Sequence, residues 1–384
     1  MPHQSRARCS VVFASAALLA SSLSYAADAP NYAQIVQDEA YWISLSQIPT
    51  NVSGPGRGGL AWYPDQGHRR LNPYIANRGA KGLLLAGAYY YPMVRAYADW
   101  YFRHLNGGAS SGLPADYAGL SGTIYDWDVD VATGSETYAP NPQQPGLPWY
   151  DSSDAYAATF LTLLRKWAEV DATSRAYLLA NAGDIQLVAS AAIATQHVDG
   201  LTGAKPDYPA EFLMDNVEVE QGLQDYAWLL QNVFADGARA AVWESKKDAL
   251  RDAIQTNMRT AGPKSMYCWA GDQCGATTWS RFYSDSVSQA WPIQARVAPA
   301  STANALWSAF NASWPDWVTS VNATDSAPWA ILAYTAATLG DKARVDAYMN
   351  GSQAHWVGAG RPWPWTIADS ADRAGAASLV STKH

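Results

Sequence analysis

The chain has 384 residues and a formal net charge of −8, with 34 Asp and Glu against 26 Lys and Arg. An acidic protein is poorly suited to nucleic acid or to other anionic polymers, because both are held largely by positive charge. We therefore expect no nucleic-acid partner, and a neutral or weakly charged ligand instead. The length by itself is a soft argument for two domains.

The N-terminal segment has the features of a secretory signal peptide. Arg6 and Arg8 form its positively charged part, residues 11–23 form a short apolar run, and Ser24-Tyr25-Ala26 fits a cleavage site. The apolar run is too short to remain as a membrane anchor, and no later stretch is apolar enough to cross a bilayer. We expect cleavage after Ala26 and a periplasmic or secreted monomer, without a membrane anchor, formed by residues 27–384.

Two of the three cysteines follow this segment. Cys268 and Cys274 have five residues between them in the sequence CWAGDQC. In an oxidising compartment this spacing predicts a disulfide that closes a small loop. No histidine lies near the pair, so we expect no metal there, and no motif in the chain calls for a cofactor.

The aromatic composition is unusual, with 18 Trp and 22 Tyr against 7 Phe. A chain that used aromatic residues only to fill a core would favour Phe, which has no polar atom in need of a partner. An excess of Trp and Tyr indicates flat, partly hydrated surfaces. Sugar rings stack on such faces and hydrogen-bond at their edges.

Hydrophobic periodicity predicts an all-α chain made of helix pairs. Short, apolar, Ala-rich helices are expected to begin near residues 72, 152, 215, 285, 327 and 365, and more polar helices near residues 89, 173, 238, 301 and 342. The helix expected at 31–47 supplies a sixth outer partner. Six such hairpins close into an (α/α)6 toroid, in which an inner ring of helices is surrounded by an outer one. Since no repeat of fixed length is present, we expect one domain over residues 27–384.

The stretch 147–170 is central to this prediction. Its helix is apolar on almost every face, which is typical of a helix inside a larger assembly. Trp149 and Tyr150 precede it, followed by Asp151 and Asp154 at its start. Helix capping alone accounts for acids at this position, so the stretch does not define a functional site by itself.

Strict alternation of side chains predicts a strand within residues 123–131, as half of a small hairpin that projects from the helical body. Its acidic face carries Asp126, Asp128 and Asp130. The DxDxD pattern is also found in calcium loops, but the expected glycine is Val131 and the expected glutamate is Thr137. Calcium is therefore the less favoured interpretation.

Acidic and aromatic residues recur together before the inner helices, whose preceding loops would converge at one end of a toroid. We expect a carbohydrate cleft there. The candidate catalytic residues are Asp154, Asp215, Asp151, Asp128 and Glu218. The candidate substrate-binding residues are Trp62, Tyr63, Asp126, Trp127, Trp149, Tyr150, Tyr283, Trp363 and Trp365. Reciprocal capping explains the Asp215/Glu218 spacing equally well.

Together, the helix rhythm and the acidic, aromatic loops resemble the six-hairpin glycosidase superfamily, the (α/α)6 toroids of several glycoside hydrolase families. The resemblance covers nearly the whole mature chain but includes no family-specific signature, so no catalytic residue is transferred. It implies hydrolysis of a polysaccharide or oligosaccharide by two carboxyl groups, one acid and one base or nucleophile. Asp154 and Asp215 begin neighbouring inner helices, which favours the wider spacing of an inverting enzyme.

Two alternatives remain open at this point. A polysaccharide lyase of the toroid type would use a Tyr with His, Asn or Arg, and His68, Asn77, Arg78 and residues 89–91 offer these types. The acidic balance disfavours a lyase, because its uronic-acid substrates are anionic. A toroid that binds sugar without cleaving it is the other alternative. No HExxH or GxSxG motif supports zinc or serine chemistry.

Overall fold

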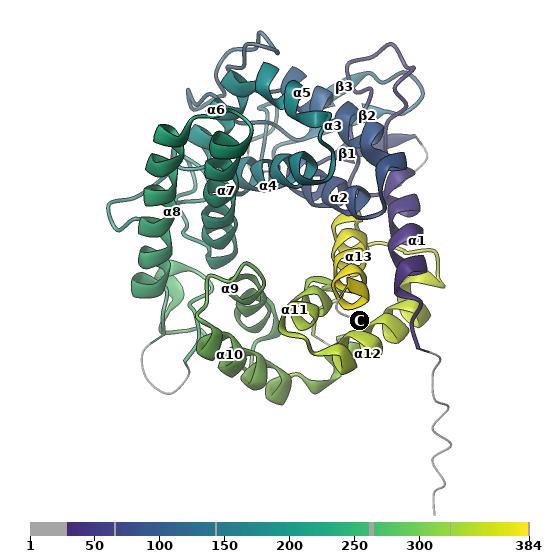
Figure 1. The fold of residues 1–384 in the computed structure, drawn as a ribbon, viewed down its shortest axis with the longest axis vertical. Helices are drawn as coiled ribbons and strands as arrows, with labels where there is room; N and C mark the ends of the chain where they lie inside the picture. Colours follow the sequence, from purple (N-terminus) through teal and green to yellow (C-terminus); the bar gives the residue numbers. More distant parts are fainter. Residues whose placement is uncertain (1–28, 65–66, 143, 261–264, 323, 383–384) are drawn as a thin grey trace, which may run out of the picture.

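The computed structural model describes residues 29–64, 67–142, 144–260, 265–322 and 324–382. Its helices form two concentric rings, as Figure 1 shows in a view down the axis of the rings. The predicted all-α (α/α)6 toroid with a small sheet beside it is confirmed. The predicted signal peptide lies outside the described residues.

Six helices form the inner ring. They are α2 (Pro73–Leu85), α4 (Asp154–Val170), α7 (Leu213–Asn232), α9 (Ala290–Gln294), α11 (Ile331–Leu339) and α13 (Ile367–Thr382). Each contacts the next in this order, and α13 contacts α2, so the ring is closed. Local sequence sets several of these boundaries. Asn72 caps α2 by accepting a hydrogen bond from the Ile75 amide at 3.0 Å, and Pro73 occupies the first turn.

The outer ring shields the inner one. Its helices are α1 (Tyr32–Ser44), α3 (Tyr91–Arg103), α5 (Ser174–Ala180), α6 (Ala182–Ala191), α8 (Gly237–Asn257), α10 (Ala300–Ser313) and α12 (Lys342–Ser352). Each packs on the inner helix beside it, and the N-terminal α1 pairs with the C-terminal α13. The outer helices have a buried and an exposed face, whereas α4 and α13 are buried over most of their length.

Two helix predictions are wrong in detail. The single helix expected to begin near residue 173 is divided into α5 and α6 at Asn181, whose side chain donates to the Tyr177 carbonyl at 2.8 Å and competes with the backbone hydrogen bonds of the helix. The helix expected to begin near residue 285 starts with π and 3₁₀ turns, and only its later part, α9, is a regular α-helix. Pro292 lacks the amide hydrogen that a regular helix would use there.

A three-stranded antiparallel sheet lies beside the ring, with strand order β1 (His68–Leu71), β2 (Trp127–Asp130) and β3 (Glu136–Tyr138). It confirms the strand predicted from the alternating Asp pattern. Arg70 and Asp128 are paired across β1 and β2 and form a salt bridge at 2.6 Å. The Asp128 carboxylate is therefore already paired within the sheet.

Close helix contacts in the inner ring depend on small side chains. A Cβ atom at Gly222 of α7 would lie 2.7 Å from the Ala158 Cα of α4, and one at Gly82 of α2 would lie 2.8 Å from the Ala371 Cβ of α13. Such distances are too short for real atoms, so these positions require glycine at the observed helix separation. The small residues allow the helix backbones to approach closely. Longer polar side chains of the same helices lie toward the ring axis.

A buried ionic cluster joins the two ends of the chain. Glu39 of α1 is fully buried and accepts hydrogen bonds from Arg361 at 3.0 and 3.1 Å and from Arg373 of α13 at 2.5 Å. Two guanidinium groups therefore surround one carboxylate in the interface between the first and last helices. Removing one member of a buried ion pair leaves the other charge buried without a counter-ion, which destabilises the fold strongly.

The predicted disulfide is confirmed between Cys268 and Cys274, in the segment between α8 and α9. Among the described residues, none of the helices combines the length and the apolar character needed to cross a membrane.

Replacing Glu39 by Gln should destabilise the protein strongly, because it leaves Arg361 and Arg373 buried without their counter-ion. We expect a loss of about 3–5 kcal/mol in the free energy of unfolding, measured by urea denaturation. The control is Asp248→Asn, which removes an exposed partner of Lys247 and should cost less than about 1 kcal/mol. Equal effects of the two substitutions would contradict the role given to Glu39.

Candidate active site

A cleft of about 320 Å³ opens at one end of the ring axis. It is lined by first-turn residues of the inner helices, among them Tyr74, Ala155, Asp215, Trp291, Ile331 and Asp369. All six inner helices therefore point their N-terminal ends at the same space. The loops that precede α4 and α11 supply further lining residues, including Asp151 and Trp329.

Four carboxyl groups line this cleft, and they differ in their partners. Asp369 accepts hydrogen bonds from the amide and hydroxyl of Thr366, and Asp372 forms a salt bridge with Arg78. No hydrogen bond or salt bridge within the described part of the chain engages the side chains of Asp151 or Asp215. These two carboxyls are therefore the ones available to a ligand.

Burial and neighbouring acids separate Asp215 from Asp151. Burial raises the pKa of Asp215 well above its usual value, and the nearby carboxyls of Asp154, Glu218 and Asp151 raise it further. Burial also raises the pKa of Asp151, but the Lys205 ammonium opposes that shift. Asp215 is therefore the carboxyl that retains its proton, and Asp151 is the one that ionises more readily.

A second layer of carboxyls lies behind the lining residues. Asp154 is fully buried, does not line the cleft, and accepts a hydrogen bond from the Thr202 hydroxyl at 2.7 Å. Burial raises its pKa to about 7. Asp126 is also buried and accepts from Asn72 and from the hydroxyl of Tyr156, and burial raises its pKa to about 7. Asp126 reaches the cleft through Tyr156, and the charge of Asp154 raises the pKa of Asp215.

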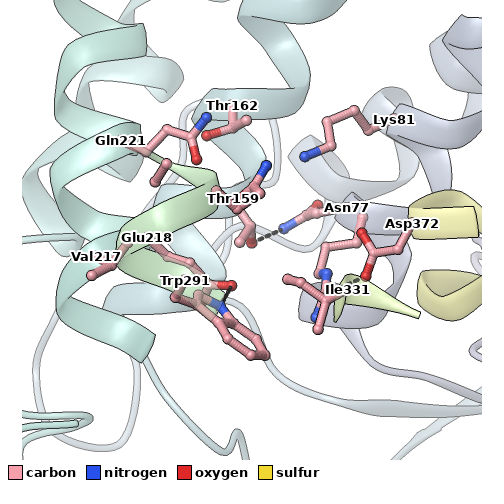
Figure 2. A pocket seen from close by; sticks show the side chains of 13 residues that line it. Asn77, Lys81, Thr159, Thr162, Val217, Glu218, Gln221, Trp291, Ile331 and Asp372 are labelled. Carbon is pink, nitrogen blue, oxygen red and sulfur yellow. Dashed lines mark hydrogen bonds and ion pairs between the residues drawn. The ribbon is translucent and has the colours of Figure 1, made fainter. Parts of the chain in front are cut away.

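A small pocket of about 30 Å³ continues the cleft along the ring axis, one helical turn deeper. Figure 2 shows Glu218 and Trp291 on one side of it, with Asn77 and Asp372 on the other. Tyr74 and Trp291 both donate to Oε1 of Glu218 at 2.8 Å, whereas its buried Oε2 has no hydrogen-bond partner among the described residues. The pocket has room for about one or two water molecules.

Arg78 connects this deeper layer to the lining residues. Its guanidinium donates to the Tyr74 hydroxyl at 3.0 Å, pairs with Asp372, and lies over the rings of Tyr74 and Trp291 at 5.3 and 5.8 Å. These contacts hold two aromatic rings and one carboxylate in fixed positions. The floor of the cleft is therefore a rigid, hydrogen-bonded surface.

Aromatic rings form much of the cleft wall. Tyr283 is 48% exposed and stacks on Trp329 with ring centroids 4.9 Å apart and an interplanar angle of 28°. Tyr74 and Tyr156 stack on each other across the opposite part of the wall, at 6.3 Å. The exposed ring of Tyr283 beside Trp329 therefore provides a flat apolar face next to polar groups.

Most of the other predicted substrate-binding residues lie outside the cleft lining. Tyr150 and Trp365 are buried, with hydrogen bonds to Asp116 and Ser370, and Trp127 contacts His104 and Tyr138 beside the sheet. The remaining positions make local aromatic or cation–π contacts: Trp62 with Trp363, Tyr63 with Trp42, and Trp149 with Lys205. Of the nine residues predicted to bind substrate, only Tyr283 lines the cleft.

Among the predicted catalytic residues, Asp151 and Asp215 line the cleft, Glu218 lines the pocket below it, Asp154 is buried behind it, and Asp128 is paired with Arg70 in the sheet. The calcium interpretation of the DxDxD pattern has little support, because Asp126, Asp128 and Asp130 each have separate partners.

The sequence prediction did not include Tyr74, Trp291 and Asp372 as site residues, and it named Arg78 only for the lyase alternative. Each of the four lies on an inner helix, in its first or second turn. A usable signal was nevertheless present. Arg78 and Asp372 are charged residues within helices made mostly of small and apolar side chains, and such a charge must either pair inside the ring or face a ligand.

Of the side chains that the structure describes among those named for a lyase, only Asn77 and Arg78 line the cleft or the pocket below it. Tyr89 is 83% exposed at the C-terminal end of α2, which is the opposite end of the ring from the cleft. Tyr91 donates to the Val170 carbonyl, and Asn77 is buried with bonds to Tyr97, Tyr156 and Thr159. Arg78 is engaged by Asp372.

Comparison with known proteins gives structural neighbours only. No family model matches the chain, and no curated protein matches it. Among solved structures, a point variant of a glycosidase aligns with a TM-score of 0.59 and 12% identity, covering 92% of this chain and 96% of that one. A D-mannose isomerase aligns with a TM-score of 0.56 and 10% identity, covering 92% of this chain and 100% of that one.

A family 76 glycoside hydrolase from a bovine Bacteroides thetaiotaomicron strain aligns with a TM-score of 0.52 and 10% identity, covering 92% of this chain and 78% of that one. At these identities the likeness concerns the fold. The chain therefore shares the toroidal fold, predicted from its helix rhythm, with glycosidases and with a D-mannose isomerase.

The raised pKa of Asp154 predicts a pH dependence of stability. A carboxyl that keeps its proton in the folded state until about pH 7, but loses it near pH 4 when unfolded, makes the protein less stable as pH rises through that window. Urea unfolding of the wild type and Asp154→Asn at several pH values measures the effect. The variant should lose less stability than the wild type between about pH 4 and 7, with no further divergence above about pH 7. Parallel pH profiles would contradict the assignment.

Proposed function

We propose that this protein is an exported glycoside hydrolase that cleaves a polysaccharide or oligosaccharide with an acid and a base carboxyl. The observation that carries the proposal is the pair Asp151 and Asp215, two carboxyls without partners among the described residues, in a cleft walled by aromatic rings. Glycoside hydrolysis needs two such carboxyls with different pKa values. The glycosidase neighbours of the fold add support, although they share only the architecture.

In this proposal Asp215 is the general acid. Its raised pKa favours the protonated form, which transfers the proton to the glycosidic oxygen as the bond to the anomeric carbon breaks. Asp151 is the base that removes a proton from the attacking water, and it must be ionised to do so. We favour inversion, in which water attacks directly and no covalent sugar–enzyme intermediate forms.

The buried carboxyls tune this pair. Asp154 and Glu218 each raise the pKa of Asp215, so neither has to touch the substrate to affect the reaction. Tyr283 and Trp329 would hold a sugar ring by stacking, while the exposed hydroxyls of the sugar meet the polar floor around Arg78 and Asp369. The cleft would then orient the glycosidic bond between the two free carboxyls.

The class of reaction is tested by incubating purified protein with a panel of polysaccharides and oligosaccharides and measuring new reducing ends. Hydrolysis predicts reducing ends without the ultraviolet absorbance of an unsaturated uronide, whereas a lyase would produce that absorbance. One structural neighbour is a D-mannose isomerase. Conversion of a free aldose into a ketose is therefore measured as well, and it would contradict the proposal. So would binding of sugar without any bond cleavage.

Asp215→Asn and Asp151→Asn should each lower kcat by at least about a hundredfold, because each removes one partner in proton transfer. The wild type should show a bell-shaped pH–rate profile, in which activity falls at high pH as Asp215 loses its proton and at low pH as Asp151 gains one. Asp128→Asn is the matched control, since Asp128 is paired with Arg70 outside the cleft. If Asp128→Asn were inactive while both other variants kept full kcat, the site would be wrong.

Replacing Tyr283 or Trp329 by Ala should weaken substrate binding through loss of the stacked face. We expect KM to rise about tenfold, equivalent to about 1.4 kcal/mol, with a smaller change in kcat. Tyr89→Ala is the control, because this exposed ring lies at the other end of the helix ring. A rise in KM for Tyr89→Ala equal to that for the other two would show that the cleft is not where substrate binds.

A further inference from the structure

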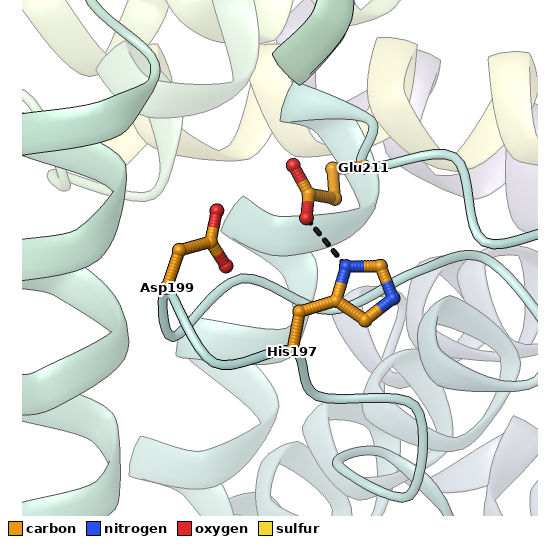
Figure 3. Close-up of side chains that lie close together, drawn as sticks. All are labelled: His197, Asp199 and Glu211. Carbon is orange, nitrogen blue, oxygen red and sulfur yellow. Dashed lines mark hydrogen bonds and ion pairs between the residues drawn. The ribbon is translucent and has the colours of Figure 1, made fainter.

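Away from the cleft, one cluster combines the side chains that bind divalent metals. His197, Asp199 and Glu211 each offer a ligand atom, and these atoms lie within 4.8 Å of one another. Figure 3 shows the imidazole of His197 facing the Glu211 carboxylate, with the carboxylate of Asp199 beside them. The cluster lies in the segment between α6 and α7 and is separate from the proposed catalytic residues.

The backbone holds two of these residues in one tight turn. The His197 amide donates to the Leu201 carbonyl at 2.8 Å, and the amide of Gly200 donates back to the His197 carbonyl at 3.1 Å. Asn257 of α8 donates to the Asp199 carbonyl at 2.9 Å. The two ligand residues therefore come from a turn that is anchored on a neighbouring helix.

Glu211 comes from a different segment that is also fixed. Its carbonyl accepts the Gly271 amide at 2.9 Å, and the next residue, Phe212, forms a bridge with Ala270 inside the disulfide loop. A Cβ atom at Gly271 would lie 2.4 Å from Oε2 of Glu211. Glycine at 271 leaves room for the carboxylate in its present position against the loop backbone, and the contact with His197 orients it.

The charges of the cluster are not balanced by cationic side chains. Nδ1 of His197 lies 2.5 Å from Oε1 of Glu211, and no lysine or arginine in the described ranges forms a salt bridge with Asp199 or Glu211. Two carboxylates beside an imidazole are a suitable ligand set for a divalent cation. This charge imbalance is independent of how closely the three side chains lie.

From this geometry we propose that His197, Asp199 and Glu211 form a zinc site. One imidazole nitrogen and two carboxylate oxygens are donors that Zn²⁺ accepts, with water as a fourth ligand, whereas Ca²⁺ selects oxygen donors only. Bond lengths of about 2.0–2.2 Å place two donors on one ion about 3–4 Å apart. Asp199 is exposed, so rotation of its side chain can bring its carboxylate to the ion, while Nδ1 of His197 and Oε1 of Glu211, 2.5 Å apart, would separate as the ion replaces the hydrogen bond between them.

The position of the site gives the ion a structural role. It would join the turn at His197 to the segment that enters α7, and Glu211 is four residues before Asp215. The disulfide loop already braces the same segment through Gly271 and Ala270. Zinc and disulfide would together fix the start of the helix that carries the proposed acid. The zinc site itself requires no particular reaction in the cleft.

The test uses the mature chain without a histidine tag, treated with a chelator and then dialysed. Titration with ZnCl₂ in a calorimeter should give one ion per chain with micromolar or tighter affinity, and ZnCl₂ should raise Tm whereas CaCl₂ should not. His197→Ala, Glu211→Gln and Asp199→Asn should each weaken binding by more than about tenfold. Asp199→Asn keeps an acceptor for the Leu201 amide, so it tests the site even if another variant misfolds.

His355→Ala is the matched control, because it removes an exposed histidine on a different part of the ring and should leave zinc affinity and the Tm shift unchanged. A wild-type protein that takes up no zinc overturns the proposal. So does equal affinity in the wild type and Asp199→Asn, or loss of binding in His355→Ala alone. Stabilisation by CaCl₂ but not by ZnCl₂ would overturn the choice of metal.

Discussion

Ring closure is the constraint on which the remaining structure depends. The first and last helices must pack together before the sixth wall of the central space exists, and Glu39 joins them by accepting hydrogen bonds from Arg361 and Arg373. Close contacts at Gly82 and Gly222 draw the inner helices together. The space that remains along the ring axis is too narrow for a large apolar core. Polar side chains such as Asn77, Arg78 and Lys81 line it.

This arrangement determines the chemistry at the mouth of the ring. Six helix N-termini surround one cleft, and their dipoles favour negative charge there. Burial and mutual repulsion act in the opposite direction and raise the pKa of Asp215. The balance leaves one carboxyl that keeps its proton and another, Asp151, that is helped to ionise by Lys205. Two unlike acids thus arise from one cluster through their surroundings alone.

The architecture could be predicted from the sequence because the inner and outer helices differ in apolar periodicity. This difference recurs in six helix pairs, so a local error such as the missed break at Asn181 does not change the predicted fold. It was less informative about the site. Asp154 and Asp215 look alike in the sequence, but a hydrogen bond from Thr202, far along the chain, accompanies the burial of Asp154 away from the cleft. Likewise, Trp365 and Tyr283 are both aromatic residues near inner-helix starts, and only packing decides which one meets solvent.

The central claim is that a sugar occupies the cleft between the stacked rings and the two free carboxyls. It is tested most directly by a crystal structure of the Asp215→Asn variant with a substrate oligosaccharide bound. We expect a sugar ring against Tyr283 and Trp329, and a glycosidic oxygen facing residue 215 with Asp151 on the other side of the anomeric carbon. An oligosaccharide bound at the opposite end of the ring, or on the outer surface, would contradict the claim.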